Sequence, residues 1–223
     1  MRKITDMNTI IFGAPGSGKG TYASRLKTRL GVEVISMGDI FREFIKNESE
    51  LGLKVKQYVE KGLLIPNEIV IEVLREKISK LTSGKGVILD GYPRTIPQAK
   101  VLQEIVKIDV ILLQNVPDWI IIERLSSRRI CEKCNEVYNI RFLKPSIENI
   151  CDKCGGALYQ RPDDTADVIK KRIQLYQKMT SPIIKYYEEK KTPFIISQIE
   201  DPNIGPEQVV ENVIKELKIR NLI

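Results

Sequence analysis

Short apolar runs alternate with amphipathic stretches along most of the chain. The apolar runs predict strands at residues 9–12, 34–36, 87–89, 110–113 and 194–196. The amphipathic stretches predict helices at residues 19–30, 67–81, 97–106, 119–127, 167–189 and 206–220. Short apolar strands that alternate with helices are typical of a parallel sheet covered by helices on both faces. We therefore predict an α/β fold with a five-stranded parallel sheet, in which Pro182 bends or breaks the helix at 167–189.

Two stretches interrupt this alternation. Residues 39–61 have a helical pattern without a strand, and residues 128–164 hold all four cysteines together with the turn-forming Pro145, Gly155 and Gly156. We interpret both as inserts in a core domain. The predicted boundaries are 1–35, 66–126 and 165–223 for the core, 36–65 for the first insert and 127–164 for the second.

The composition narrows the classes of function. The chain of 223 residues contains no histidine, which excludes a histidine base, nucleophile or metal ligand. The net charge of +7 suits anionic partners such as nucleotides or nucleic acid, although a lysine-rich surface also serves solubility alone. No run approaches the roughly 18 apolar residues that span a membrane, and the first apolar run is too short for a signal peptide. We therefore expect a cytoplasmic protein without a membrane partner.

A glycine-rich segment, Gly-Ala-Pro-Gly-Ser-Gly-Lys-Gly-Thr at residues 13–21, lies between the first predicted strand and the first predicted helix. Glycines lack a Cβ, so the backbone can wrap around phosphate oxygens, and the helix N-terminus points its N–H groups at the anion. Lys19 adds a positive charge for the β- and γ-phosphates. The context predicts a phosphate-binding loop (P-loop) and a P-loop three-layer fold. Because the hydroxyl is on Thr21, one place after Gly20, the segment resembles the nucleoside monophosphate kinases.

Asp90 follows the predicted strand at 87–89 and should lie beside this loop. A carboxylate in that position is well placed to hold Mg²⁺, directly or through water. The alternative interpretation is a helix cap or a turn residue.

Further segments resemble the adenylate kinase family, in particular its long-lid, zinc-binding type. The matching segments are G-D-I-F-R at 38–42, G-L-L-I-P at 62–66, L-D-G-Y-P-R-T at 89–95, S-R-R-I-C at 127–131 and Y-Q-R-P-D-D at 159–164. The resemblance covers nearly the whole chain. It implies reversible, Mg²⁺-dependent transfer of the terminal phosphoryl group of ATP to AMP, giving two ADP. It also implies that insert 36–65 binds AMP and that insert 127–164 is a zinc-binding lid over ATP.

The resemblance implies roles for single residues. ATP would bind to Gly16, Ser17, Gly18, Lys19, Gly20, Thr21, Arg124 and Arg128. AMP would bind to Met37, Arg42, Leu63, Leu64, Ile65, Gly91, Arg94, Gln98, Arg161 and Arg172. Gln98 would read the adenine edge, and Arg161 and Arg172 would also surround the ATP phosphates when the lid closes. The residues that would act in catalysis are Lys19, Arg94, Arg128, Arg161 and Arg172, while Asp90 and Thr21 would hold Mg²⁺ through water.

The chemistry of phosphoryl transfer agrees with this set of residues. The reaction depends on positioning and on spread positive charge more than on acid–base chemistry. An AMP phosphate oxygen is already ionised at neutral pH, so no base is needed, in agreement with a chain that lacks histidine. Arginine stays charged and pairs bidentately with phosphate. For any single arginine, a solvated surface cation is the commoner alternative.

The chain departs from the family pattern in two places. Met37 stands where the family usually has threonine, so a hydroxyl contact near AMP is lost or replaced. Near Glu200 and Asp201 the adenine-contacting turn of the family is not clearly matched, and we assign no residue there.

The four cysteines form two C-x2-C pairs separated by sixteen residues, Cys131 with Cys134 and Cys151 with Cys154. This spacing predicts a zinc site, and four thiolates fill a tetrahedral shell, so the metal would be structural. A reducing cytoplasm opposes disulfides as the alternative, and iron also suits four thiolates. We expect the metal to supply folding free energy that so short an insert lacks.

Two other functions remain as alternatives. A kinase that uses GTP or phosphorylates UMP or CMP belongs to the same class, although the long lid and Gln98 favour AMP. A zinc-ribbon nucleic-acid-binding module is the remote alternative, and it would leave the P-loop unexplained. The expected partners are therefore ATP, AMP and ADP, without nucleic acid, bound by a monomer.

Overall fold

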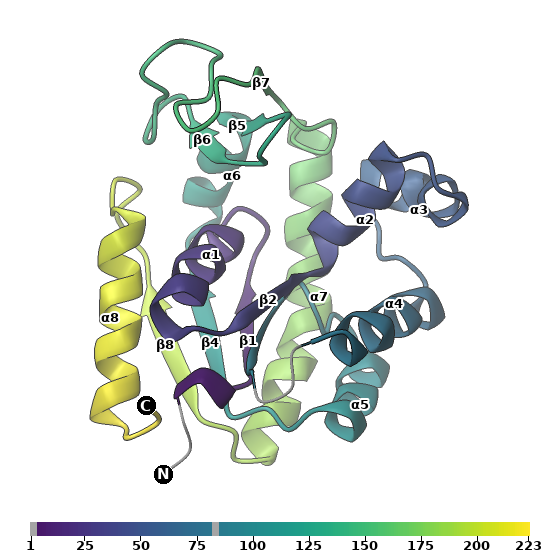
Figure 1. Ribbon diagram of the computed structural model, residues 1–223, viewed down its shortest axis with the longest axis vertical. Coiled ribbons are helices and arrows are strands. Elements are labelled where there is room, and N and C mark those ends of the chain that lie inside the picture. Colours follow the sequence, from purple (N-terminus) through teal and green to yellow (C-terminus); the bar gives the residue numbers. More distant parts are fainter. Residues whose placement is uncertain (1–3, 82–84) are drawn as a thin grey trace.

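A five-stranded parallel sheet forms the centre of the computed structural model, which describes residues 4–81 and 85–223 (Figure 1). The strand order is β2-β3-β1-β4-β8, and every neighbouring pair runs parallel. The strands are β1 (Thr9–Gly13), β2 (Glu33–Ser36), β3 (Val87–Asp90), β4 (Val110–Asn115) and β8 (Phe194–Gln198). Each apolar run that predicted a strand lies in one of them, so the predicted fold class is confirmed.

Helices connect these strands. They are α1 (Lys19–Leu30), α2 (Met37–Lys46), α3 (Glu50–Glu60), α4 (Asn67–Ser79), α5 (Ile96–Ile105), α6 (Asp118–Ser126), α7 (Ala166–Glu189) and α8 (Pro206–Ile219), preceded by a 3₁₀ turn at Ile4–Asp6. Local signals fix several ends. Helix α1 ends at Gly31, whose φ of 69° is easy only for glycine, and α5 begins after Thr95, whose side chain accepts a hydrogen bond from the Gln98 N–H.

Alternating side chains of the strands fill two separate cores, one on each face of the sheet. Ile11 of β1 packs in the same buried cluster as Leu26 of α1 and the apolar side of α8. Its neighbours Ile10 and Phe12 pack in the other cluster, with Leu74 of α4 and the apolar side of α5. A fully buried residue of this kind contributes roughly 1.5–3 kcal/mol relative to exposure. The sheet therefore holds the three layers together from both faces, as the strand pattern predicts.

The sequence predicts that Pro182 bends or breaks the helix at 167–189; α7 continues through it, so the predicted break is wrong. A proline inside a helix removes one backbone hydrogen bond. Here Pro182 is exposed, and water can reach the backbone that it leaves unpaired. The neighbouring Ile183 and Tyr187 are almost completely buried against the sheet, and this burial offsets the lost bond.

Two segments extend beyond these layers. Helices α2 and α3 follow β2 directly, and residues 47–49, all of which the structure describes, connect them without a strand. The second segment forms an antiparallel sheet of order β6-β5-β7, which lies above α6 and α7 in Figure 1. Its strands are β5 (Arg128–Cys131), β6 (Val137–Asn139) and β7 (Leu158–Tyr159). Within residues 4–81 and 85–223, no helix is both long enough and apolar enough to cross a membrane.

Candidate active site

A cleft of about 680 Å³ opens at the carboxyl ends of β1 and β3, between the two inserted segments. Ligands of open α/β sheets bind at this edge, because the loops that leave parallel strands gather there. The residues with a predicted nucleotide-binding role line this cleft, with the exception of Ser17, which is completely buried beneath the loop.

The glycine-rich loop connects β1 to the first turn of α1. Gly18 has a φ of 97°, and a Cβ at this position would lie 2.6 Å from the ring of Tyr22. Gly16 has a φ of 84°, and its Cβ would lie 2.7 Å from Leu125. Both positions therefore require glycine, in conformation and in space. The loop leaves the N-terminus of α1 facing the cleft, an arrangement that favours anions.

Lys19 is the first residue of α1, and its side chain folds back onto the glycine-rich loop. Its ammonium group donates hydrogen bonds to the carbonyl oxygens of Gly13, at 2.6 Å, and Ala14, at 2.9 Å. Burial lowers the pKa of Lys19 to about 8, although the Asp90 carboxylate opposes the shift. An anion in the cleft would restore the stability of the charged form, so the site favours a ligand rich in negative charge.

Asp90 ends β3 beside this loop, as predicted. A Cβ at Gly20 would lie 3.4 Å from its Oδ2, which places the carboxylate against the start of α1, next to Thr21. Burial raises the pKa of Asp90, while the nearby Lys19 acts in the opposite direction. A carboxylate and a hydroxyl at the edge of a phosphate cleft are oxygen donors, which Mg²⁺ prefers, so the residues present fit this ion.

Seven arginines line the cleft. Arg25 in α1 pairs with Glu207, and the six with a predicted role come from different elements. These six are Arg42 in α2, Arg94 after β3, Arg124 in α6, Arg128 in β5, Arg161 after β7 and Arg172 in α7. Burial lowers the pKa of Arg161 and of Arg172 to about 10, and both stay charged at neutral pH. The buried Nε of Arg161 has no hydrogen-bond partner among the described residues. Such a group is expected to bind an anionic acceptor.

Three aspartates to which the sequence analysis assigned no role pair with these arginines. Asp164 accepts two hydrogen bonds from Arg128, from Nε at 2.8 Å and from Nη2 at 2.5 Å. Asp163 pairs with Arg172 at 2.8 Å. Because both carboxylates are buried, they fix the two guanidinium groups at the base of the second insert.

The third aspartate lies in the first insert. Asp39 is 2.5 Å from Arg42 and 3.5 Å from Arg161. It therefore connects an arginine of the first insert with one of the second insert. A further contact joins the inserts, because Lys46 at the end of α2 donates a hydrogen bond of 3.0 Å to the carbonyl oxygen of Glu132. The two inserts face each other across the cleft.

The predicted AMP pocket lies on the side of the first insert. Leu63, Leu64, Ile65 and Gly91 line the cleft there. Met37 also reaches the cleft, but its side chain is 2% exposed and packs in the core with Phe41 and Val55. Met37 therefore supports the wall of the pocket by packing, whereas the threonine usual at this place would offer a hydroxyl for a hydrogen bond.

Gln98 is 2% exposed, and both ends of its amide have protein partners. Its Oε1 accepts a hydrogen bond from the Arg94 N–H at 2.7 Å, and its Nε2 donates one to Asn67 Oδ1 at 2.9 Å. The amide still has one N–H and one oxygen lone pair for a ligand.

A turn at residues 202–206 also reaches the cleft, at the end occupied by Arg124. Arg124 Nη2 donates a hydrogen bond of 3.4 Å to the carbonyl oxygen of Pro202. No residue of this turn was predicted to bind a nucleotide. The available signal was the Pro-Asn-Ile-Gly-Pro segment that follows the last strand, because such a turn must lie at the same carboxyl edge of the sheet.

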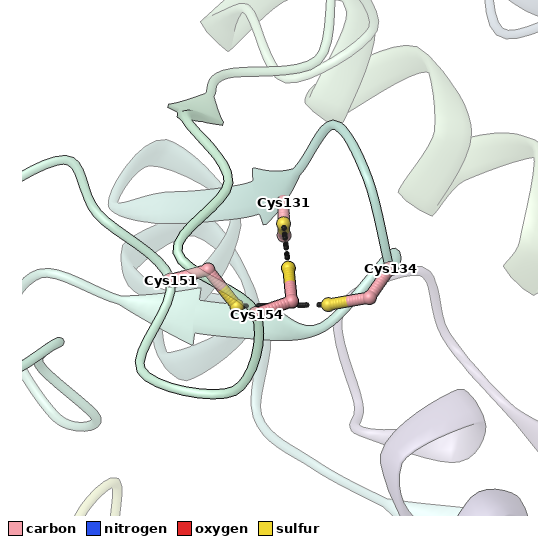
Figure 2. Close-up of side chains that lie close together, drawn as sticks. All are labelled: Cys131, Cys134, Cys151 and Cys154. Carbon is pink, nitrogen blue, oxygen red and sulfur yellow. Dashed lines mark hydrogen bonds between the residues drawn. The ribbon is translucent and has the colours of Figure 1, made fainter.

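The four cysteines converge in the second insert, and Figure 2 shows their sulfurs turned toward one another. All four are free thiols, and their sulfurs lie within 4.8 Å of one another. Cys131 and Cys154 are 3.4 Å apart, and Cys134 and Cys151 are 3.6 Å apart. Four sulfurs around zinc, each at about 2.3 Å, would be about 3.8 Å apart. The cluster therefore fits a tetrahedral zinc ion.

Comparisons with known proteins agree with this geometry. A family model described as adenylate kinase matches residues 11–192. The adenylate kinase of Caldicellulosiruptor saccharolyticus is 48% identical over 189 residues, 82% of this chain and 88% of that protein. That of Clostridium tetani is 40% identical over 212 residues, 93% of this chain and 96% of that protein. That of Thermosipho melanesiensis is 42% identical over 216 residues, 95% of this chain and 97% of that protein.

Proposed function

This chain belongs to the adenylate kinase family, the ATP:AMP phosphotransferases, and on that premise we propose how its cleft gathers the two nucleotides end to end. The observation that carries the proposal is the convergence on one cleft of Lys19 and the six arginines with a predicted role, from elements far apart in the sequence. This positive charge, which Asp39, Asp163 and Asp164 offset only in part, favours polyanionic ligands, and ATP and AMP supply phosphates.

The glycine loop holds the donor. Backbone N–H groups of residues 16–21 surround the β- and γ-phosphates of ATP, and the Lys19 ammonium exchanges its bonds to loop carbonyls for phosphate oxygens. Arg124, which is bound to the turn at Pro202, lies at the outer end of the same site. Asp90 and Thr21 would hold Mg²⁺ through water, and the bound ion would supply charge neutralisation for the donor phosphates.

The first insert holds the acceptor. Arg42 and Arg94 bind the AMP phosphate, while Leu63, Leu64, Ile65, Met37 and Gly91 form the pocket around the nucleoside. Gln98 reads the adenine edge with the N–H and lone pair that its protein partners leave unused. Asp39, now paired with Arg42 and Arg161, gives up these arginines to phosphate when AMP enters.

The remaining arginines act on the group in transfer. Arg128, Arg161 and Arg172 lie between the two nucleotide sites and stabilise the charge spread over the equatorial oxygens. The nucleophile is an ionised AMP phosphate oxygen, so the chain needs no general base. Closure of both inserts excludes water, which would otherwise accept the phosphoryl group in place of AMP.

We assign residues 1–35, 66–126 and 165–223 to the core, 36–65 to the AMP-binding insert and 127–164 to a lid that holds a structural zinc ion. We also propose that the protein acts as a monomer in the cytoplasm, where thiols remain reduced. The distances among the four free thiols support zinc in the lid.

Formation of ADP from ATP and AMP tests these assignments, with and without Mg²⁺ and with GTP, UMP and CMP as competing substrates. Lys19→Met should reduce kcat/KM by about 100-fold or more, because it removes charge stabilisation in the transition state. Lys27→Met on the same helix is the control, because Lys27 is half exposed and forms a surface ion pair with Glu33. A Lys19→Met enzyme that matches the Lys27→Met enzyme in rate would overturn the assignment.

A further inference from the structure

The amide of Gln98 is held in one orientation by its neighbours. The N–H of Arg94 can only donate a hydrogen bond, so the group at 2.7 Å from it must be the amide oxygen Oε1. Nε2 therefore lies on the other side, where it donates to Asn67 Oδ1 at 2.9 Å. A flipped amide would place its N–H₂ group against the N–H of Arg94 and lose both hydrogen bonds.

Asn67 is itself oriented by the same network. Thr95 Oγ1 accepts a hydrogen bond from the Gln98 N–H at 3.3 Å and donates its own hydrogen to Asn67 Oδ1 at 3.0 Å. Asn67 Oδ1 thus accepts two hydrogen bonds, one from Thr95 and one from Gln98. The Arg94 N–H, the Thr95 hydroxyl and Gln98 Nε2 each donate to an amide oxygen, and these three hydrogen bonds leave a single arrangement for the Gln98 side chain.

The orientation matters because purine bases differ at the edge that an amide reads. Adenine offers a donor at N6 beside an acceptor at N1, and an amide carbonyl with an amide N–H complements this pair. Guanine and hypoxanthine offer the reverse, an acceptor at O6 beside a donor at N1. An amide held in one orientation accepts one class of base and opposes the other, whereas an amide that can flip accepts both.

We propose that Asn67 is a specificity-determining positioning residue, which together with the Arg94 N–H holds the amide of Gln98 so that the acceptor site takes adenine and rejects 6-oxopurines. Asn67 is the first residue of α4 and does not line the cleft, so it acts through Gln98. The inference rests on the proposed role of Gln98 at the AMP base.

Asn67→Ala removes the acceptor and tests this role through kcat/KM for AMP and for IMP, whose base is a 6-oxopurine. The ratio of the two values should fall by about fivefold, which corresponds to the roughly 1 kcal/mol of the one orienting hydrogen bond that is lost. The KM for ATP should not change. Asn67→Asp keeps an oxygen that accepts from Thr95 and Gln98, so it should retain the ratio of the unaltered enzyme.

A double-mutant cycle separates this role from general destabilisation. Gln98→Leu removes the reading amide, so Asn67→Ala added to it should leave the AMP/IMP ratio unchanged. The inference is overturned if Asn67→Ala keeps the ratio within about twofold of the unaltered enzyme, or if it lowers the ratio equally in the Gln98→Leu background. It is also overturned if Asn67→Asp loses the ratio as Asn67→Ala does. If the unaltered protein makes no ADP from ATP and AMP, the proposed function itself fails; if only the ratios disagree, this inference alone fails.

Discussion

The two inserts face the same cleft but are held in place by different forces. The helical insert buries Met37, Phe41 and Val55 in the large cluster that also contains the sheet residues Ile10 and Leu89. The buried cluster of the lid is separate and small. Its members are Cys131, Tyr138, Cys151 and Leu158, so half of it consists of thiols.

The lid also leaves apolar side chains in water. Ile147 is 62% exposed, and Ile140, Leu143 and Ile150 are each more than 40% exposed. Its three strands are two to four residues long, too short to hold an independent sheet. The lid therefore has too little core to hold its own fold by burial, so its order should depend on the proposed metal ion.

Removal of the metal should have the largest effect, and it should affect the lid but not the helical insert. Structural zinc contributes roughly 10–16 kcal/mol in zinc-finger peptides, far more than the burial available in this lid. A chelated sample should therefore lose amide protection against hydrogen exchange at residues 128–160. Residues 37–60 of the helical insert should keep theirs, because burial holds them.

Addition of zinc to the same chelated sample is the control, and it should restore the protection at 128–160. A lid that stays protected after complete loss of metal would show that its own packing is sufficient. The comparison between the two inserts would then be wrong.

The helical insert should respond to loss of burial instead. Phe41 is 3% exposed, and Phe41→Ala should lower the free energy of unfolding by about 3–5 kcal/mol, since it leaves a cavity in the shared core. Leu53→Ala is the matched control, because Leu53 of the same insert is 62% exposed and should matter by less than about 0.5 kcal/mol. Urea denaturation measures both, and equal effects would contradict a burial-held insert.

Patterns that are local in the sequence predicted the fold well. The apolar runs of the central strands were readable because these strands are buried on both faces of the sheet, and β1 is buried at all five positions. The edge strands β2 and β8 are only partly buried. The glycine loop was readable because the strand, loop and helix that it requires are adjacent in the chain. The cysteine spacing was readable for the same reason.

Pairings between distant residues could not be read. The carboxylates Asp39, Asp163 and Asp164 are ordinary polar residues in the sequence, and only folding shows that they hold the arginines of the cleft. That α7 continues through Pro182 could not be read either, because it depends on the burial of Ile183 and Tyr187 against the sheet. The partners of Gln98 lie 4 and 31 residues away, so its orientation is a property of the fold.

Acidification should remove a stabilising charge at the base of the lid, the Asp163 carboxylate. Burial would raise the pKa of Asp163, but Arg172 and Arg128 outweigh it and hold the pKa below its usual value. The unfolded chain then takes up a proton first as the pH falls. The stabilisation by Asp163 is complete above pH of about 4, the pKa of a free aspartate, and is lost as the pH falls through the lower pKa of the folded state.

Asp163→Asn should therefore lower the free energy of unfolding by about 1–3 kcal/mol at pH 6 and by less at pH 3. Urea denaturation across this range measures the difference.

Asp39→Asn is the counterpart in the helical insert. The pKa of Asp39 is also lowered, by Arg42 and Arg161 against the effect of burial, but its side chain is 55% exposed and water weakens the pairing. An Asp39→Asn effect as large as that of Asp163→Asn would contradict this difference.

The contact between the inserts should have the smallest effect. Lys46 donates a hydrogen bond to the Glu132 carbonyl across the cleft, and both residues are exposed, so the contact is worth no more than about 1 kcal/mol. Lys46→Met should raise amide exchange at residues 132–136 of the nucleotide-free protein by no more than about fivefold, which corresponds to that energy. Lys56→Met in α3 removes a charge from the same insert without a lid contact, since Lys56 pairs with Glu60, and should leave this exchange unchanged. If Lys46→Met instead raised amide exchange in the lid as much as chelation does, the order of the lid would depend on its contact with the helical insert. A bound metal would then not explain the difference between the two inserts.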